Sequence, residues 1–408
     1  MTFHVHRLAN GLEIIAECNP DAYSSAYGFF VRTGSRDETD ELSGVSHFLE
    51  HMAFNGTAKR SADDVNRRLD ELGANANAYT SEEKTVYYAA VLPEYQSDMV
   101  ELLADIMRPA LREEDFVTEK KVILEEIFKY EDQPPFGAHE KCMAAYFGRH
   151  PLGRTILGTN ESVSRLTPEM MRQYFERRYC PGNMVLVGAG RVDWERLIAD
   201  AESLCGHWTV GDTARLTPPA DANYGTQLLR KPDATQEYVI QISPGPATED
   251  EDRYAARILA TCVGDDSGSR FFWELTDKGL VEYAGLSTYE FQGTGIYMGY
   301  LCCAPEDTAS NLEIVRRIYD EVERSGVLAS EVELAKSKIN SHIVLRAERP
   351  LNRMFAVGSS WIQRHEYQTL QDVVIAYDRV TLDDVHTVLA KYPLSRHNTF
   401  AVGPLDEL

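Results

Sequence analysis

Two histidines four residues apart, His47 and His51, form the stretch of this sequence with the clearest capacity for chemistry. On a helix, this spacing places both imidazoles on the same face, one turn apart. Two imidazoles held in this way can bind one tetrahedral metal ion, and Zn²⁺ is the usual occupant of such a pair. Glu50 borders the same face, close enough to polarise a metal-bound water without being a ligand. The stretch therefore predicts a zinc site with an adjacent acid–base group.

A catalytic zinc ion needs a third protein ligand, and a carboxylate from another element can supply it. The sequence predicts a long helix over about residues 113–129, in which Glu119 and Glu126 lie seven residues apart and so share a face. Charged residues on a helix usually form solvated surface, and this interpretation is kept for Glu113 and Glu114. For Glu126, metal binding competes with that interpretation.

The elements predicted around these residues are those of a mixed helix and sheet domain. Alternating apolar and polar residues over 3–17 and 24–33 predict antiparallel strands. Residues 74–81 and 85–92 predict a hairpin whose first strand has small side chains. At a sheet edge, such a strand lets a peptide backbone approach and pair with it. A plain edge strand explains the same composition, so both interpretations stay open here.

Length and composition restrict the class of protein further. With 408 residues the chain is too long for one ordinary core, and two domains are expected. The net charge of −23 argues against nucleic acid as a partner, because phosphate binding needs basic surface. Seven scattered cysteines without a Cys-x-x-Cys pair indicate free thiols in a reducing compartment. The sequence shows neither a signal peptide nor an apolar membrane span, so we expect a cytoplasmic protein with no membrane partner.

These residues together resemble the pitrilysin-type inverzincin metallopeptidases, in which the motif reads His-x-x-Glu-His. The resemblance is greatest to the group of the mitochondrial processing peptidase subunits and their bacterial relatives, and it covers nearly the whole chain. The segments that carry it are 44–57, 77–80, 119–126, 150–153 and 183–185.

The resemblance implies an α+β fold with two homologous domains, residues 1–217 and 224–408. Each would be a mainly antiparallel sheet with helices packed on one face, and only the first would carry the metal site. Such a chain is half of a peptidase clamshell in the family. It closes around a peptide substrate as a homodimer or as a heterodimer with a related subunit.

The resemblance also assigns roles in the first domain. It implies that His47, His51 and Glu126 hold Zn²⁺. Glu50 would be the general base of the reaction. Glu119 would orient one of the ligands by a hydrogen bond, as carboxylates commonly do for metal-bound histidines.

The edge strand and the second domain supply the remaining implied site residues. Asn77, Ala78 and the adjacent Tyr79 match the strand that pairs with the substrate backbone. Tyr283 matches a tyrosine that hydrogen-bonds the substrate carbonyl, but the arginine expected seven residues earlier is Thr276 here. Loss of one such donor typically costs about 2.7–4 kcal/mol of transition-state stabilisation.

The activity implied is that of a zinc-dependent endopeptidase acting on extended or unstructured peptides. The alternative is a non-catalytic peptide-binding or assembly subunit of the same family that needs a partner chain. Thr276 favours this alternative, whereas the complete set of metal ligands speaks against it. A purely structural zinc site is disfavoured. In such sites protein side chains, usually including cysteines, fill all four coordination positions, and no cysteine lies near the motif.

Overall fold

The computed structural model describes residues 1–211 and 213–408, and the chain divides into two compact units. Each unit takes most of its residues from one half of the chain and one segment from the other half. Unit 1 comprises Met1–Lys129, Arg154–Leu216 and Leu345–Gln368, and unit 2 comprises Tyr130–Gly153, Thr217–Val344 and Thr369–Leu408. The predicted domains, 1–217 and 224–408, are continuous in sequence, whereas these units are not.

Six strands form the sheet of unit 1 in the order β1-β2-β6-β3-β5-β4. All neighbours are antiparallel except β2 and β6, which run parallel. The strands are β1 (Thr2–Arg7), β2 (Glu13–Cys18), β3 (Ser25–Val31), β4 (Asn75–Thr80), β5 (Thr85–Val91) and β6 (Met184–Gly190). The predicted hairpin of β4 and β5 is confirmed, and β4 lies at one end of the sheet. The stretch 3–17 forms two antiparallel strands, β1 and β2, with Asn10 and Gly11 between them.

Strand β3 shows why this sheet is covered on both faces. Side chains of a strand point alternately to the two faces of the sheet. Tyr27, Phe29 and Val31 belong to one hydrophobic core, and Ala26 and Phe30 belong to another. All five are fully buried, so helices must cover both sides of the strand.

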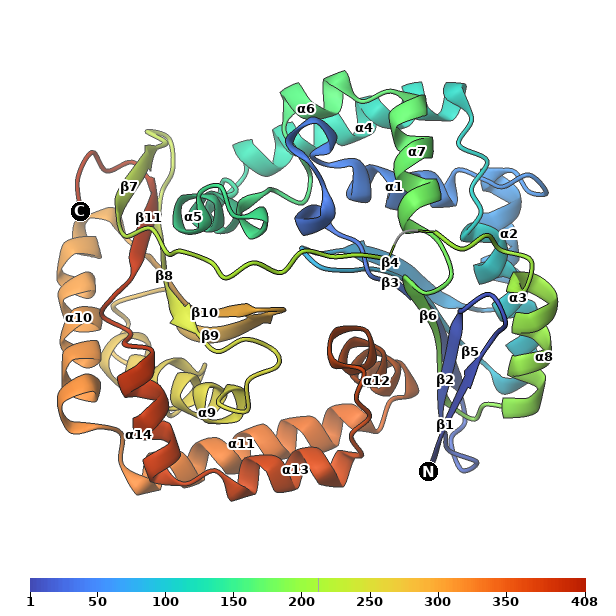
Figure 1. Cartoon of the computed structure of the whole chain (residues 1–408). Helices are drawn as coiled ribbons and strands as arrows, with labels where there is room; N and C mark the ends of the chain where they lie inside the picture. Colours follow the sequence, from blue (N-terminus) through green and yellow to red (C-terminus); the bar gives the residue numbers. More distant parts are fainter. Residues whose placement is uncertain (212) are drawn as a thin grey trace. The chain divides into compact units, whose positions relative to one another are not determined.

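The first face of the unit 1 sheet is covered by helices from the first half of the chain. They are α1 (Val45–Phe54), α2 (Ala62–Glu71), α3 (Gln96–Ile106), α4 (Glu113–Asp132), α6 (Asn160–Arg165), α7 (Pro168–Arg178) and α8 (Trp194–Cys205). The opposite face is covered by α12 (Pro350–Arg364), which Figure 1 shows across the sheet from α3 and α8. Gly358 permits close packing there, since a Cβ atom would lie 2.5 Å from the Phe30 ring.

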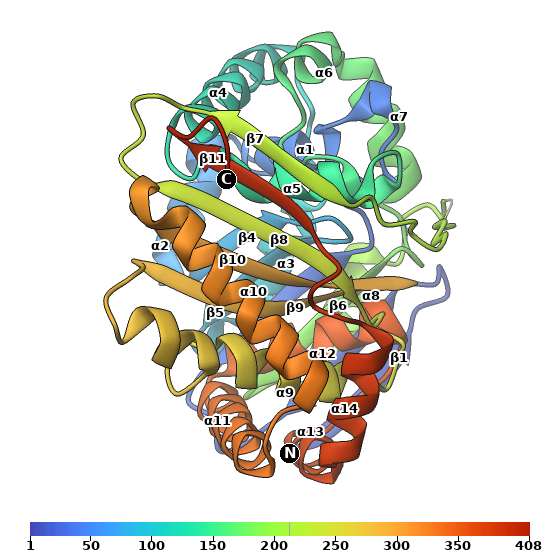
Figure 2. The ribbon, with the colours of Figure 1, turned by 90° about the vertical axis from the view of Figure 1, so that its left-hand side faces the viewer.

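Unit 2 repeats the sheet of unit 1 without its first strand. Its order is β7-β11-β8-β10-β9, seen as neighbouring strands in Figure 2. Only β7 and β11 run parallel, so these five strands match β2, β6, β3, β5 and β4 in order and direction. The strands are β7 (Gly225–Arg230), β8 (Glu237–Gly245), β9 (Tyr283–Phe291), β10 (Thr294–Cys303) and β11 (Asn398–Gly403). The predicted α+β class with two homologous sheets is thereby confirmed.

Helices cover both faces of the unit 2 sheet as well. One face packs against α9 (Arg253–Gly264), α10 (Thr308–Ser325), α11 (Ala329–Ala347), α13 (Leu370–Arg379) and α14 (Leu382–Lys391). The other face packs against α5 (Ala138–Phe147), which comes from the first half of the chain. Short helical turns complete the fold: η1 (Ser35–Asp37), η2 (Asp40–Leu42), η3 (Pro93–Tyr95), η4 (Pro151–Gly153), η5 (Phe272–Thr276) and η6 (Pro305–Asp307).

The expectation of helices on one face of each sheet was therefore wrong. The second face of each sheet is covered by a single helix from the opposite half of the sequence, α12 in unit 1 and α5 in unit 2. Among the described residues, none of these helices is both long and apolar enough to cross a membrane.

Helix α12 is fixed to strand β2 by a buried ion pair. The Nε atom of Arg353 donates to Oε1 of Glu17 at 2.8 Å, and the terminal guanidinium nitrogen donates to the second carboxylate oxygen. The Tyr367 hydroxyl also donates to Glu17 at 2.8 Å. Glu17 and Arg353 are 2% and 7% exposed, so neither charge has water as an alternative partner.

We expect Arg353→Met to destabilise unit 1 by about 3–5 kcal/mol, because the substitution leaves a buried carboxylate without its counter-charge. Urea denaturation followed by circular dichroism measures the change. The double variant Glu17→Leu with Arg353→Met should recover much of this lost stability, since it also removes the unpaired carboxylate. A single variant as stable as the wild type would show that the ion pair does not hold α12.

Candidate metal centre

Helix α1 begins at a defined point because its first backbone donors are bound by a buried carboxylate. The Glu38 side chain accepts hydrogen bonds from the backbone N–H groups of Gly44 and Ser46, each at 2.8 Å. Gly44 has φ +91°, and a Cβ atom there would lie 2.6 Å from the carbonyl oxygen of Leu157. Burial raises the pKa of Glu38 to about 8, while the two backbone donors act in the opposite direction. These contacts fix the start of the helix that carries the histidines.

The structure brings the three predicted metal ligands together. His47 and His51 lie on one face of α1, with ring centroids 4.6 Å apart. The Nε2 atoms of the two rings lie 3.9 and 3.6 Å from Oε2 of Glu126 on α4. One ligand atom from each of the three residues lies within 4.8 Å of the others.

This donor set fits a zinc ion. Two imidazole nitrogens and a carboxylate oxygen are ligands that catalytic zinc sites use, with the fourth position open. The distances of 3.6 and 3.9 Å are too long for hydrogen bonds. They are close to the separation of roughly 3.4 Å expected between two ligands of one tetrahedral zinc ion.

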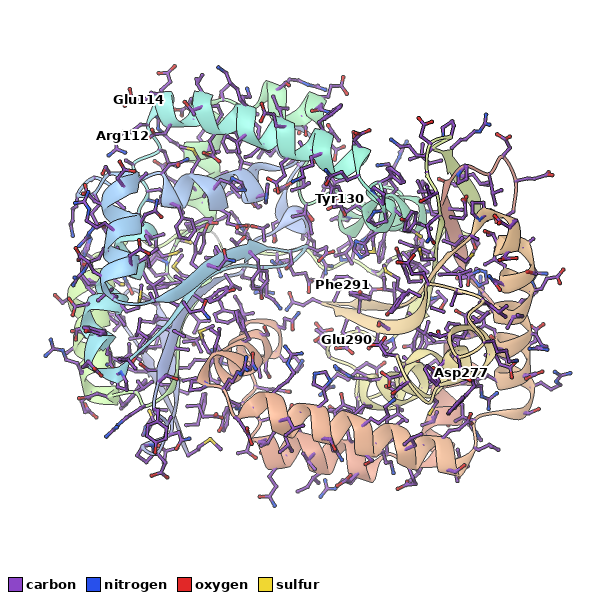
Figure 3. The ribbon with its side chains drawn as sticks, turned by 180° about the vertical axis from the view of Figure 1, so that it is seen from behind. Arg112, Glu114, Tyr130, Asp277, Glu290 and Phe291 are labelled. Carbon is purple, nitrogen blue, oxygen red and sulfur yellow. The ribbon has the colours of Figure 1, made fainter. Side chains whose placement is uncertain are left out.

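Glu119 contacts one of these imidazoles. Its Oε1 atom lies 2.8 Å from Nδ1 of His51, and its Oε2 atom accepts a hydrogen bond from the Asn55 side chain at 2.8 Å. With Nδ1 engaged, Nε2 of His51 faces Glu126. Glu119 and Glu126 both lie on α4, which runs in Figure 3 between the labelled Glu114 and Tyr130. Carboxylates commonly hold metal-binding histidines in this way.

The surroundings set the protonation of the two histidines differently. Burial, together with the neighbouring His51, lowers the pKa of His47 to about 3, so His47 is neutral and able to bind a metal. Burial also disfavours protonated His51, but the hydrogen bond with Glu119 and the charges of Glu126, Glu119 and Glu50 outweigh it and raise the pKa. The hydrogen bond with His51 lowers the pKa of Glu119.

Glu50 lies on α1 between the two histidines in sequence and contacts strand β4. The Thr80 hydroxyl donates a hydrogen bond to Oε2 of Glu50 at 2.6 Å. Burial raises the pKa of the Glu50 carboxyl, and the bond from Thr80 opposes this effect. A carboxyl group with a raised pKa is suited to accept and return a proton near neutral pH.

The residues predicted to bind peptide lie on β4, which pairs only with β5 among the described strands. The Ala78 N–H donates to Oδ1 of the Asn77 side chain at 2.8 Å, so it is not used in pairing with β5. The Tyr79 ring packs against Phe355 of α12, with centroids 6.0 Å apart.

Tyr283 lies in unit 2, whereas the other predicted site residues lie in unit 1. It is the first residue of β9, is 43% exposed, and has its ring centroid 5.5 Å from that of Tyr300. Thr276 ends the short turn η5. Arg270 lies six residues before Thr276 and could be considered as a substitute for the expected arginine, but its guanidinium group is engaged by two hydrogen bonds to Glu331, at 2.8 and 2.9 Å.

Three residues that contact the site were not predicted to do so. Asn55 and Thr80 lie inside the segments that carry the resemblance, but no pattern in those segments predicted their bonds to Glu119 and Glu50. Glu38 precedes the motif and binds the start of α1. The available signal was an acidic residue a few positions before the motif helix, where it can reach the first backbone N–H groups of that helix.

Comparison with known proteins places this architecture in a family. Residues 13–160 match the family model described as insulinase (peptidase family M16), and residues 165–339 match the model described as peptidase M16 inactive domain. An uncharacterized zinc protease of Mycobacterium tuberculosis is 32% identical over 404 residues, which cover 97% of this chain and 92% of that protein. The zinc protease YmxG of Bacillus subtilis is 32% identical over 383 residues, 92% of each chain.

Solved structures show the same fold at low sequence identity. A protease from Helicobacter pylori has a TM-score of 0.92 at 20% identity, with 99% of both chains covered. A chain of complex III2 from Candida albicans has a TM-score of 0.85 at 18% identity, covering 99% of this chain and 96% of that one. The chain belongs to peptidase family M16, the insulinase family. Its family and the names of its relatives support a zinc-using metallopeptidase.

We expect Glu119→Gln to weaken zinc binding by about 10–100-fold, because the carboxylate that orients His51 is lost while the three ligands remain. Competition with a fluorescent zinc chelator measures the affinity. Glu125→Gln is the matched control, since it makes the same charge change on an exposed position of α4. Equal affinities of Glu119→Gln and the wild type would rule out this role for Glu119.

Proposed function

We propose that this protein is a zinc-dependent endopeptidase that hydrolyses extended or unstructured peptides. In this proposal His47, His51 and Glu126 hold the zinc ion, Glu119 orients His51, and Glu50 is the general base. The family and the names of the relatives support a zinc protease, and the roles of these individual residues are our inference.

One observation carries the proposal. The ligand atoms of two imidazoles on α1 and of one carboxylate on α4 all lie within 4.8 Å of one another. The hydrogen bond that Nδ1 of His51 donates to Glu119 is the second contact expected of a metal-binding histidine.

Zinc bound at these residues would supply Lewis-acid chemistry, polarising the scissile carbonyl and lowering the pKa of a water molecule. Glu50 would take a proton from the attacking water and return it to the amine of the leaving peptide. Its raised pKa suits both transfers, because the carboxyl group must release the proton that it has accepted. Glu119 would keep the His51 ring fixed during both steps.

Peptide recognition would use the open side of β4. An extended peptide can add to Asn77, Ala78 and Tyr79 through backbone hydrogen bonds, which do not depend on peptide sequence. Selectivity would therefore be loose. Tyr283 would hydrogen-bond the substrate carbonyl, and a second copy or a related subunit would complete the enzyme.

We also propose a cytoplasmic location. All seven cysteines are free, which is expected of a protein in a reducing compartment. Nucleic acid is not a proposed partner, because the net charge of −23 disfavours contact with phosphates.

The second candidate is a non-catalytic peptide-binding or assembly subunit. Thr276 at the position of the family arginine favours it, because one donor to the substrate carbonyl is missing. Similar folds occur in a peptidase M16 inactive domain from Pseudomonas fluorescens and in complex III2 of Candida albicans. The complete set of ligand side chains in this protein favours the peptidase.

We expect Glu50→Gln to lower the rate of hydrolysis of an unstructured peptide by about 10²–10⁴-fold while zinc content and peptide binding stay unchanged. Mass spectrometry of the digest, with and without a chelator, measures the cleavage and its metal dependence. Activity in Glu50→Gln equal to that of the wild type would remove Glu50 from its role, and cleavage that survives complete zinc removal would contradict the zinc mechanism.

We expect Thr276→Arg to raise kcat, by up to about 10²–10³-fold, because it adds a donor for charge that develops on the substrate carbonyl. Thr276→Gln is the control for side-chain length without the positive charge. Steady-state kinetics on the same peptide measures both variants. If the wild type and Thr276→Arg both bind zinc and the peptide but neither cleaves it, the non-catalytic subunit is favoured.

A further inference from the structure

We propose that Thr80 is a positioning residue for the general base, so that the peptide-binding strand β4 itself fixes the orientation of the Glu50 carboxylate. This inference rests on the proposed function. It adds a residue that acts through Glu50 and links strand β4 to the Glu50 carboxylate.

The contact between the two side chains is short and directional. The Thr80 hydroxyl donates to Oε2 of Glu50 over 2.6 Å, within the range of a hydrogen bond from a hydroxyl to a charged carboxylate. Among the described residues, this is the single hydrogen bond made by the Glu50 side chain. Oε1 therefore remains available for the proton of the attacking water.

The neighbouring threonine explains why the Thr80 proton points to Glu50. Thr85, opposite Thr80 in the β4–β5 hairpin, is fully buried and donates its hydroxyl proton to the carbonyl oxygen of Thr33 at 2.9 Å. The two threonine hydroxyls lie 3.4 Å apart. Each hydroxyl has one proton. Thr85 uses its proton in the bond to Thr33, and Thr80 donates its own to Glu50.

The placement of Thr80 couples two parts of the proposed reaction. Thr80 ends β4, three residues after Asn77, so one short strand carries both the peptide edge and the partner of the base. Glu50 lies on α1, and its hydrogen bond to Thr80 joins that helix to the strand. A peptide that pairs with β4 would order the strand and hold the carboxylate at the same time.

The test is Thr80→Val, which replaces the hydroxyl with a methyl group of similar size and keeps a side chain suited to a strand. We expect kcat for an unstructured peptide to fall by about 10–100-fold, with KM and zinc content unchanged. Thr80→Ser restores the hydroxyl and should recover most of the loss. Ser81→Ala is the matched control, because it removes the hydroxyl of the next residue, which bonds only within the turn at Lys84.

A double variant separates this role from a structural one. In the Glu50→Gln background Thr80→Val should cause no further loss of kcat, because the two residues act as a unit. If Thr80→Val does not fold, the comparison is made between Thr80→Ala and Thr80→Ser. A full kcat in the variant without a hydroxyl, or a rise in KM alone, would overturn the inference.

The outcomes for the two proposals are distinct. Loss of hydrolysis in Glu50→Gln with wild-type kcat in Thr80→Val would leave the proposed function standing and remove Thr80 from it. Wild-type hydrolysis in Glu50→Gln would instead contradict the proposed function, whatever the result at Thr80.

Discussion

The packing of α1 and α4 on one face of the same sheet is the constraint on which the candidate site depends. The rings of Phe48 on α1 and Phe116 on α4 stack with centroids 4.6 Å apart, and Ile123 of α4 is fully buried in the same core. This packing sets the register of the two helices. The polar side chains of α4 at positions 119 and 126 then face the imidazoles of α1. A shift of α4 by one residue would rotate both carboxylates away from them.

The elements near the site were predictable because their signals are local. The spacing of His47, His51 and Glu50 needs only a helix to place the groups on one face. The hairpin of β4 and β5 follows from alternation and small residues. The meeting of α1 with Glu126 required more than local pattern, because it depends on the packing of distant segments; the resemblance supplied it in advance of the structure.

The exchange of α5 and α12 between the two units could not be predicted from local pattern. Neither helix gives a sign in the sequence of which sheet it will cover. A partial signal did exist in β3: residues 26–31 form an uninterrupted apolar run, in place of the alternation from which the strand over 24–33 was predicted. Such runs are typical of strands buried on both faces. The contacts of Glu38 and Thr80 involve single side chains with no periodic signal.

The two units share a fold but differ in their candidate chemistry. Their five shared strands have the same order and direction, yet among the described residues only unit 1 brings together three side chains able to hold a metal ion. Unit 2 contributes Tyr283 in the proposed reaction. A common architecture thus carries a candidate metal site in one of its two copies.

The central claim is that two imidazoles and one carboxylate hold a common zinc ion. X-ray absorption spectroscopy at the zinc edge, combined with metal analysis of the purified protein, tests this claim most directly. The account predicts about one zinc per chain, bound only by nitrogen and oxygen atoms at about 2.0–2.2 Å, with an imidazole signature. Protein purified without zinc that fails to take it up, or a sulfur shell at about 2.3 Å, would contradict it.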